Sequence, residues 1–458
     1  MALKKLTLLL AMCFVVLSLS GCQFSNLDSD NLMRPPKASG DGQAIQEALD
    51  RALGSGYVLR YPRNGIHRSA IVRADFDGDE IDEAVVFYRA ATDAGGTRIA
   101  LMDKTEETDV WTVVYNSKGD GSEVERVILP DFDGDGSAEL VIGWKTYTGS
   151  NIIAAYIYSE GQLTSVPVTE PTSAFGVSSS ISYSELEAID IDGDKRDELL
   201  IASIDNINGL SSVKMAEYLT VSGAGSLGVS GEITLDSSIT GFSGSVSGQI
   251  APEVYGMYLG SYRGTAKITT DLIVWDKDKA ALAAPFMTLK EPFVRSGDTS
   301  PQDIDGDGMI EFSSDVEMPS FSVENGEKLY LTTWLGYSPD SEALAEKKQT
   351  RIELPDKGYA ISFAEEWVSK VTAQRNNDDE VYFYSYNGEV LGDELFRIKT
   401  FSVEEWDEIE SEQDEEIEYK YRAIHTDSYS VFAVLISARA QSEGITYAEI
   451  EKSFMPLE

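Results

Sequence analysis

Four short segments of the chain carry carboxylates at one fixed spacing, and this repeated pattern is the feature best suited to chemistry. The segments read DFDGDEIDE, DFDGDGSAE, DIDGDKRDE and DIDGDGMIE, with carboxylates at positions 1, 3, 5 and 9 and glycine at position 4. The carboxylates are Asp75, Asp77, Asp79 and Glu83 in loop 1; Asp131, Asp133, Asp135 and Glu139 in loop 2; Asp190, Asp192, Asp194 and Glu198 in loop 3; and Asp303, Asp305, Asp307 and Glu311 in loop 4.

Carboxylates gathered in this way favour a bound cation. At ~5 Å and an effective dielectric constant of about 20, each pair repels by roughly 3 kcal/mol. A hard cation with many oxygen ligands relieves this repulsion, and calcium is the one we expect, since magnesium favours a tighter octahedron with fewer protein ligands. Glycine at position 4 permits the positive φ that turns the loop back. The carbonyl oxygens at position 7, candidate further ligands, belong to Ile81, Ser137, Arg196 and Met309.

The loops differ from EF-hands, which begin with a similar acidic pattern. An EF-hand needs a bidentate glutamate at position 12 and a helix on each side. Position 12 is an aliphatic residue in loops 1 to 3 and serine in loop 4, and loops 1 to 3 are followed by short apolar runs typical of strands. We therefore expect calcium loops between β-strands. The alternative is metal-free Asp-Gly hairpin turns, which four copies with one carboxylate spacing disfavour.

The intervals between the loops predict the architecture. Loops 1 to 3 start at near-equal intervals, and loop 4 starts after an interval about twice as long, so a unit without the acidic loop should lie near residue 246. A period of about 57 residues with several short strands fits one four-stranded propeller blade. The sequence predicts a mainly β fold, with a β-propeller over residues 41–355 that begins with a short helix at 43–53.

The acidic loops resemble the FG-GAP repeats of integrin-alpha-type β-propellers, also called VCBS repeats in bacterial surface proteins. The resemblance covers roughly residues 57–350 and is strongest at the DxDGD segments. It implies calcium in loops at the ends of blade strands and usually about seven blades. The repeat region holds only five or six periods of about 57 residues. The expected number of blades is therefore five to seven.

The N-terminal residues are typical of a targeting segment. Residues 1–21 combine a basic start with an apolar run too short for a membrane span, as in a signal peptide. The run ends in LSGC, which resembles the lipobox of bacterial lipoproteins and implies that Cys22 is lipidated. Residues 22–40 would then form a flexible tether. The alternative is an ordinary secretory signal with an incidental cysteine. We expect an extracytoplasmic protein anchored by lipid to a bacterial membrane.

The chain is strongly acidic, which limits its partners. In 458 residues, 37 Lys and Arg stand against 78 Asp and Glu, for a net charge of −41. This charge disfavours nucleic acid and direct contact with anionic lipid, and it makes cations the natural partners. With only two histidines, His-based zinc sites and most His-based catalysis are hard to build.

The pattern changes after residue 355, and residues 356–458 predict a small α+β domain. Strand-like alternation is interrupted by two capping boxes, SVEE from Ser402 and TYAE from Thr446. Its first segment, GYAISFAEEW, loosely resembles the PsbP/Mog1-like fold, a likeness that implies no site residues. Ten of the residues in 404–418 are acidic. We interpret them as a solvated helix and loop, with a docking site for a basic partner as the alternative.

Other motifs in the sequence lack the local context that their function requires. GAGSLG at 223–228 matches a dinucleotide fingerprint, but a strand-like segment follows where a helix is required. Ser226, within the same segment, resembles the serine of a nucleophile elbow. The only histidines that could assist it are His67 and His425, and neither lies in a helpful local context. We expect no catalytic residues and no nucleotide cofactor. The aromatic residues that could form a glycan-binding face are Trp144, Tyr147, Tyr156, Tyr158, Tyr255, Tyr258 and Tyr262.

These features favour a calcium-stabilised propeller that acts as a binding or scaffolding module at the cell envelope, for a protein or glycan ligand of unknown identity. Two alternatives stay open. A polysaccharide-acting enzyme requires a deep polar pocket with convergent carboxylates and perturbed pKa values away from the loops. An envelope assembly factor would act through the C-terminal domain, with partner binding that weakens with salt.

Overall fold

The computed structural model describes residues 40–457 except 55, 92–94, 105–109, 160, 170–180, 206–207, 222–223, 296–298, 320–328, 376–379, 413–419 and 443. The expected signal peptide, Cys22 and nearly all of the tether lie outside the described residues, as does the end of the acidic stretch 404–418. Among the helices that are described, none has the length and apolar character needed to cross a membrane.

The described strands form six small sheets that follow one another along the chain and are almost entirely antiparallel. Sheet 1 contains β1 (Tyr57–Leu59), β2 (Ile71–Ala74), β3 (Glu83–Ala90), β4 (Arg98–Lys104) and β5 (Trp111–Lys118). Sheet 2 contains β6 (Glu123–Ile128), β7 (Leu140–Lys145), β8 (Asn151–Ser159) and β9 (Gln162–Val166). Sheet 3 contains β10 (Val168–Thr169), β11 (Glu185–Ile189), β12 (Glu198–Ile204), β13 (Ser211–Val221) and β14 (Ala224–Thr234).

The other three sheets complete the described fold. Sheet 4 contains β15 (Gly241–Ala251), β16 (Val254–Tyr262), β17 (Ile268–Asp276), β18 (Ala281–Ala283) and β19 (Val294–Arg295). Sheet 5 contains β20 (Phe312–Glu317), β21 (Tyr330–Tyr337), β22 (Ala345–Leu354), β23 (Tyr359–Ser362) and β29 (Phe454–Pro456). Sheet 6 contains β24 (Val371–Arg375), β25 (Val381–Tyr386), β26 (Leu391–Ser402), β27 (Arg422–Thr426) and β28 (Ser430–Ile436). The helices are α3 (Asp41–Leu53), α4 (Val403–Glu412), α5 (Ala438–Ser442) and α6 (Tyr447–Ser453), with 3₁₀ turns η1 (Pro285–Thr288) and η2 (Pro355–Lys357).

Neighbouring sheets share their hydrophobic cores, as propeller blades do. Each core cluster between two sheets draws buried side chains from both of them. Representative members of the five shared cores are Val85 with Ile142, Val141 with Leu199, Leu200 with Leu259, Tyr258 with Phe312, and Ile352 with Phe396. Helix α3 lies at the start of this series and packs Ile45 and Leu49 into the outer core of sheet 1.

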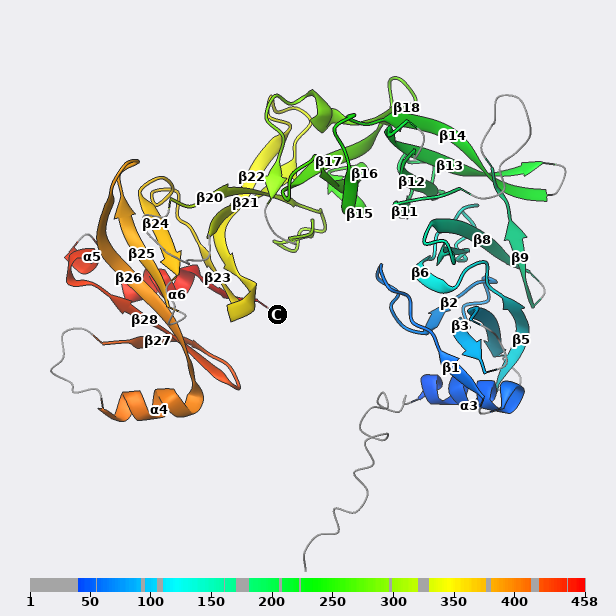
Figure 1. Cartoon of the computed structure of the whole chain (residues 1–458), viewed down its shortest axis with the longest axis horizontal. Helices are drawn as coiled ribbons and strands as arrows, with labels where there is room; N and C mark the ends of the chain where they lie inside the picture. The colour runs from blue at the N-terminus through cyan, green and yellow to red at the C-terminus, as the bar shows by residue number, and fades with distance from the viewer. Residues whose placement is uncertain are drawn as a thin grey trace, which may run out of the picture.

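The sheets lie along an arc with sheet 1 at one end and sheet 6 at the other (Figure 1). The predicted mainly β fold of blade-like sheets is confirmed. Sheet 4 occupies the place near residue 246 where a unit without the acidic loop was predicted. There the turn from β15 to β16 replaces the loop, with Ala251 facing Val254.

Burial explains why these segments form strands. In the central strands β3, β7 and β12 the first five residues are all buried, because these strands lie inside a sheet and between neighbouring sheets. The outer strand β5 alternates between half-buried and exposed residues after Trp111, as expected for a strand with one solvated face. Apolar and β-branched residues therefore recur in the central strands of successive sheets.

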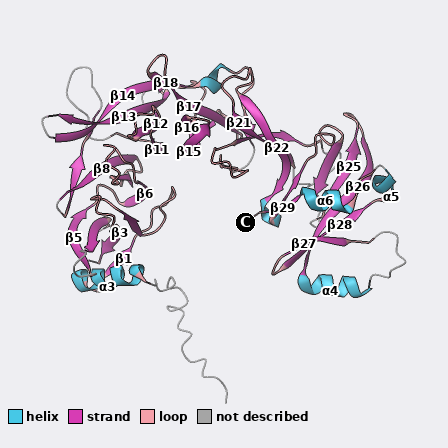
Figure 2. Cartoon of the chain, turned by 180° about the vertical axis from the view of Figure 1, so that it is seen from behind, coloured by secondary structure: helices cyan, strands magenta, loops and turns pink. Residues whose placement is uncertain are grey.

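The last part of the chain is mixed, with sheet 6 accompanied by helices α4 to α6 (Figure 2). Both predicted capping boxes are confirmed: Ser402 and Glu405 bond each other's backbone at the start of α4, and Thr446 and Glu449 do the same at α6. Strand β29 returns from this region and pairs with β23 in sheet 5. Sheet 5 is therefore built from both sides of residue 355.

Candidate metal centre

Loops 1 to 3 each join two neighbouring strands of one sheet, and all four loops lead into a longer strand. Loop 1 joins β2 to β3, loop 2 joins β6 to β7, and loop 3 joins β11 to β12. Loop 4 comes directly before β20. The glutamate at position 9 is therefore at or next to the first residue of a strand in every copy. The sheet fixes this end of the loop, as the sequence predicted.

The aspartate at position 1 folds the loop around its own carboxylate. In loop 1, Asp75 accepts the backbone N–H of Gly78 at 2.7 Å on Oδ1 and that of Glu80 at 2.9 Å on Oδ2. Loops 2, 3 and 4 repeat both bonds. The backbone has positive φ at the two residues that donate these bonds, which at position 4 is always glycine. The predicted role of this glycine is confirmed.

The glutamate at position 9 is buried and bonds back to the start of the loop. It is at most 4 % exposed in all four copies. Its Oε2 accepts the backbone N–H at position 2, for example Phe76 at 2.8 Å from Glu83 and Phe132 at 2.6 Å from Glu139. In Glu311 the other oxygen, Oε1, has no hydrogen-bond partner within the described residues.

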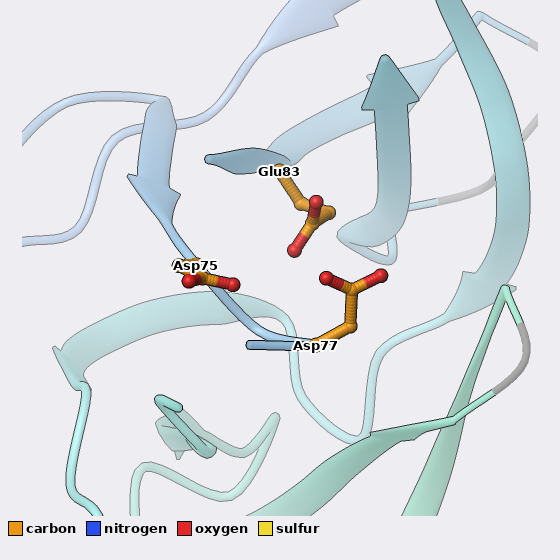
Figure 3. A group of neighbouring side chains, drawn as sticks. All are labelled: Asp75, Asp77 and Glu83. Atoms are coloured by element: carbon orange, nitrogen blue, oxygen red, sulfur yellow. The ribbon is translucent and has the colours of Figure 1, made fainter. Parts of the chain in front are cut away.

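Carboxylate oxygens converge in each loop. In Figure 3, the side chains of Asp75, Asp77 and Glu83 point toward one common space. One oxygen from each of three carboxylates lies within 4.8 Å of the others in all four loops. The groups are Asp75, Asp77 and Glu83; Asp131, Asp133 and Glu139; Asp190, Asp192 and Asp194; and Asp303, Asp305 and Glu311. These clusters could hold a metal ion.

The other predicted ligands lie in the same loops but outside these groups. They are Asp79, Asp135, Asp307 and Glu198. Asp79, Asp135 and Asp307, at position 5, each use Oδ1 to accept the N–H of position 7, at 2.8 Å in all three loops. Glu198 accepts the N–H of Ile191 at 3.1 Å, the same bond that the other position-9 glutamates make.

Burial and mutual repulsion show in the acidity of these groups. Burial, together with neighbouring aspartates, raises the pKa of Glu83 and Glu198 to about 8 and that of Glu139 to about 7. Burial also raises the pKa of Asp77, and the charge of Asp79 adds to the rise. A cation among these oxygens would favour the ionised forms and reverse the shifts. The loops are thus chemically suited to a cation.

The loops also join neighbouring sheets through their backbones. The N–H at position 8 of loop 2, from Ala138, donates to the carbonyl oxygen of Asp75 at 2.9 Å. Asp197 in loop 3 donates in the same way to Asp131 of loop 2, at 2.8 Å. Ile310 in loop 4 donates to Gln249, at the end of β15, at 2.8 Å. A metal that fixes one loop therefore also fixes its contact with the next sheet.

Two acidic residues near the loops were missed by sequence reasoning. After burial and the nearest loop carboxylate, Asp103 in β4 also raises the pKa of Asp77 and Glu83, and Glu217 in β13 contributes to the raised pKa of Asp192. The first residue after the position-9 glutamate, Ala84 or Leu199, pairs with Met102 or Ala216 on the next strand. Asp103 and Glu217 directly follow these two partners. Only the strand register reveals this relationship.

Several other sequence candidates have structural roles. Trp144, Tyr156 and Tyr258 are buried and belong to the cores, whereas Tyr147 is 72 % exposed and Tyr255 is 42 % exposed. Tyr158 and Tyr262 are half-buried. The residues after GAGSLG form strand β14 as predicted, and the fingerprint therefore lacks its helix.

The two histidines lie apart from any catalytic arrangement in the described residues. His67 lies in the connection between β1 and β2, where burial lowers its pKa. His425 lies in β27, with its ring 5.5 Å from that of Phe454.

A cavity of about 1010 Å³ opens beside sheets 2, 3 and 4, away from the acidic loops. Its lining includes Asn151, Glu185, Lys214 and Glu232. Burial raises the pKa of Glu185, although the neighbouring Arg126 opposes the rise. The Arg126 guanidinium lies 3.0 Å from Glu185 and 2.8 Å from Glu187. This carboxylate is therefore held in an ion pair between sheets.

Comparison with known proteins supports the repeat and adds little beyond it. Residues 131–201, which include loops 2 and 3, match the FG-GAP-like repeat family. No curated protein matches the sequence. Two distantly similar crystal structures are a putative 6-phosphogluconolactonase from Bacteroides uniformis and Saccharomyces cerevisiae Sqt1. The first has 10 % identity over 73 % of this chain and 88 % of the other, with a TM-score of 0.30. The second has 14 % identity over 83 % and 97 %, with a TM-score of 0.29. The chain thus contains an FG-GAP-like repeat at 131–201.

Proposed function

We propose that the acidic loops hold calcium and that this calcium stabilises a β-propeller-type binding module. The observation that carries the proposal is the repetition of one loop geometry in four places, with three carboxylate oxygens converging each time. Oxygen-only donor sets of this kind suit calcium. The carboxylates at positions 1, 3 and 9, helped by position 5 and the carbonyl at position 7, would hold the ion.

The calcium would act as a structural element. It would neutralise the crowded carboxylates and fix the loop backbones, whose hydrogen bonds reach the neighbouring sheet. Because ligands that bind only the folded state raise its stability by mass action, calcium should raise the melting temperature. The test is thermal unfolding of the chain from Gln23 onward in calcium, in magnesium and in a chelator. A melting temperature equal in all three would contradict the proposal.

The binding role is supported by the FG-GAP-like repeat, since such a repeat suggests a propeller-type binding module rather than an enzyme. We propose that the ligand is a protein or glycan and that the cavity beside sheets 2 to 4 receives part of it. The cavity presents Lys214, Glu232 and Asn151, a polar set suited to hydroxyl or amide groups. Binding of oligosaccharides and peptides to the chain and to a Lys214→Ala variant tests the location, and equal binding would argue against it.

We propose further that Cys22 carries lipid and anchors the protein outside the cytoplasm. The support is the LSGC segment after the apolar run of residues 6–19. Expression in a bacterial host with a labelled fatty acid tests this. Label in the wild-type chain that is lost in Cys22→Ser is the expected result. Equal labelling of both chains would contradict it.

A further inference from the structure

Within the described residues, a lysine side chain lies among the carboxylates of loop 4. The Nζ of Lys348, in β22, donates a hydrogen bond to Asp307 Oδ2 at 3.1 Å. The same atom lies 3.7 Å from Asp305 Oδ2 and 3.8 Å from Glu311 Oε1. These three carboxylates stand at positions 5, 3 and 9. The ammonium therefore lies among the oxygens that the sequence pattern assigns to a metal.

A β-bulge directs the Lys348 side chain toward loop 4. In the pairing of β21 with β22, Trp334 faces Gln349 and Leu335 faces Lys347, so Lys348 is the extra residue. A bulge redirects the side chain of its extra residue. Gly336 leaves room for the stem, since a Cβ at that position would lie 3.1 Å from the Cε of Lys348. The strand geometry thus positions the ammonium.

Sheets 1 and 3 provide an internal comparison, because each has a bulge at the same place in the repeat. The extra residues there are Val114 and Ser230, and neither carries a positive charge. In sheets 1 and 3, the positions equivalent to Gly336 hold the acidic residues Asp103 and Glu217. Loops 1 and 3 thus have a negative charge nearby, on β4 and β13, whereas loop 4 has a positive charge nearby, on β22.

The burial of Glu311 favours a nearby cation. This residue is 1 % exposed, and its Oε1 accepts no hydrogen bond within the described residues. A buried carboxylate oxygen without a partner is strongly unfavourable. Lys348 lies within ion-pair distance of this oxygen and compensates its charge.

We propose that the Lys348 ammonium is the resident cation of loop 4, in the place that calcium takes in loops 1 to 3. The inference rests on the proposed calcium role of those three loops. It follows that sheet 5 keeps its loop folded without calcium. The chain should then bind one calcium ion fewer than it has acidic loops.

The test is calorimetric titration of calcium chloride into the chain from Gln23 onward. We compare the wild type with Lys348→Met, which keeps the length of the stem and removes the charge. Lys347→Met is the matched control, because Lys347 is the neighbouring residue of β22 and pairs with Glu365. The expected numbers of bound ions are three for the wild type and the control and four for Lys348→Met. The double variant Asp305→Asn/Lys348→Met should return to three.

The outcomes separate the inference from the function on which it rests. Equal numbers of ions in the wild type and Lys348→Met, whether three or four, would overturn the inference and leave calcium binding in place. No ions in the wild type and one in Lys348→Met would support the lysine role and overturn the calcium role of loops 1 to 3. No ions in either chain would overturn both. Melting curves in chelator establish that each variant is folded.

Discussion

The backbone N–H of Ala138 donates a 2.9 Å hydrogen bond to the carbonyl oxygen of Asp75, so that loop 2 is joined to the first residue of loop 1. The same bond recurs between Asp197 and Asp131. Loss of the proposed calcium from one loop would therefore loosen two sheets at once. Stability and the contact between sheets should respond together when metal is removed.

Removal of one loop carboxylate tests this coupling. Asp77→Asn, Asp133→Asn and Asp192→Asn should each lower the number of bound calcium ions by one. At a calcium concentration one hundred times the dissociation constant, each lost site lowers the free energy of unfolding by about 2.7 kcal/mol. Asp276→Asn, at the last residue of β17, is the control and should change neither quantity. Hydrogen exchange should show faster exchange at Ala138 in Asp77→Asn, and unchanged exchange there would contradict the coupling.

Gly143→Ala should destabilise the contact between sheets 2 and 3. A Cβ at Gly143 would lie 1.9 Å from the hydroxyl oxygen of Tyr183, so the tyrosine must move. Overpacking of this kind lowers the free energy of unfolding by about 1–3 kcal/mol. Gly56→Ala is the control, because its Cβ would meet Ala91 at an ordinary 3.8 Å. Urea unfolding of both variants measures the difference, and equal midpoints would show that Tyr183 yields without penalty.

Arg126→Met should be strongly destabilising. Its side chain is 12 % exposed and pairs with Glu185 and Glu187, which the substitution leaves as uncompensated charges. Breaking a buried pair from one side typically lowers the free energy of unfolding by about 3–5 kcal/mol. Arg63→Met removes an exposed ion pair with Glu123 and should change the free energy of unfolding by less than about 1 kcal/mol. Chemical denaturation of the two variants compares them, and similar losses would refute the role of burial.

The stabilisation by calcium should grow with pH. In the metal-free loops, burial raises the pKa of Glu83 and Glu198 to about 8, above the ordinary 4.5 of a glutamate. The folded metal-free chain therefore holds protons that the unfolded chain releases. This contribution to stability is complete below pH 4.5 and disappears as the pH rises toward 8. Calcium needs the ionised carboxylates, so its affinity rises over the same range.

The measurement is the difference in melting temperature between calcium and chelator, taken from pH 6 to pH 8. Titrating groups outside the loops affect both samples and cancel in the difference. We expect a larger difference at pH 8. A difference that is constant or shrinks with pH would contradict the raised pKa values of these glutamates.

The acidic loops were predictable, because the spacing of their carboxylates and glycine determines their local geometry. Within the described part of the chain, the Asp75 side chain bonds residues of its own loop, and such short-range bonds are encoded by spacing. The blade without an acidic loop was predictable for a similar reason. A constant period places a strand pair near residue 246 even where the ligands are lost.

Asp103, Glu217 and Lys348 were not predictable, since the approach of Asp103 and Glu217 to the loops depends on strand register and that of Lys348 on a bulge in β22. A shift of one residue would send each of these side chains to the opposite face. The burial of Trp144 and Tyr258, two candidates for a glycan-binding face, likewise depends on contacts between sheets.

The pairing of β29 with β23 has a consequence for the order in which the chain folds. Sheets 1 to 4 each consist of strands close together in sequence, so each can form soon after its residues leave the ribosome. Sheet 5 receives its last strand only after sheet 6 and helix α6 have been synthesised, because Tyr359 pairs with Pro456. Contacts between residues so far apart in sequence form slowly. Until then, β23 is an open edge through which two nascent chains could pair.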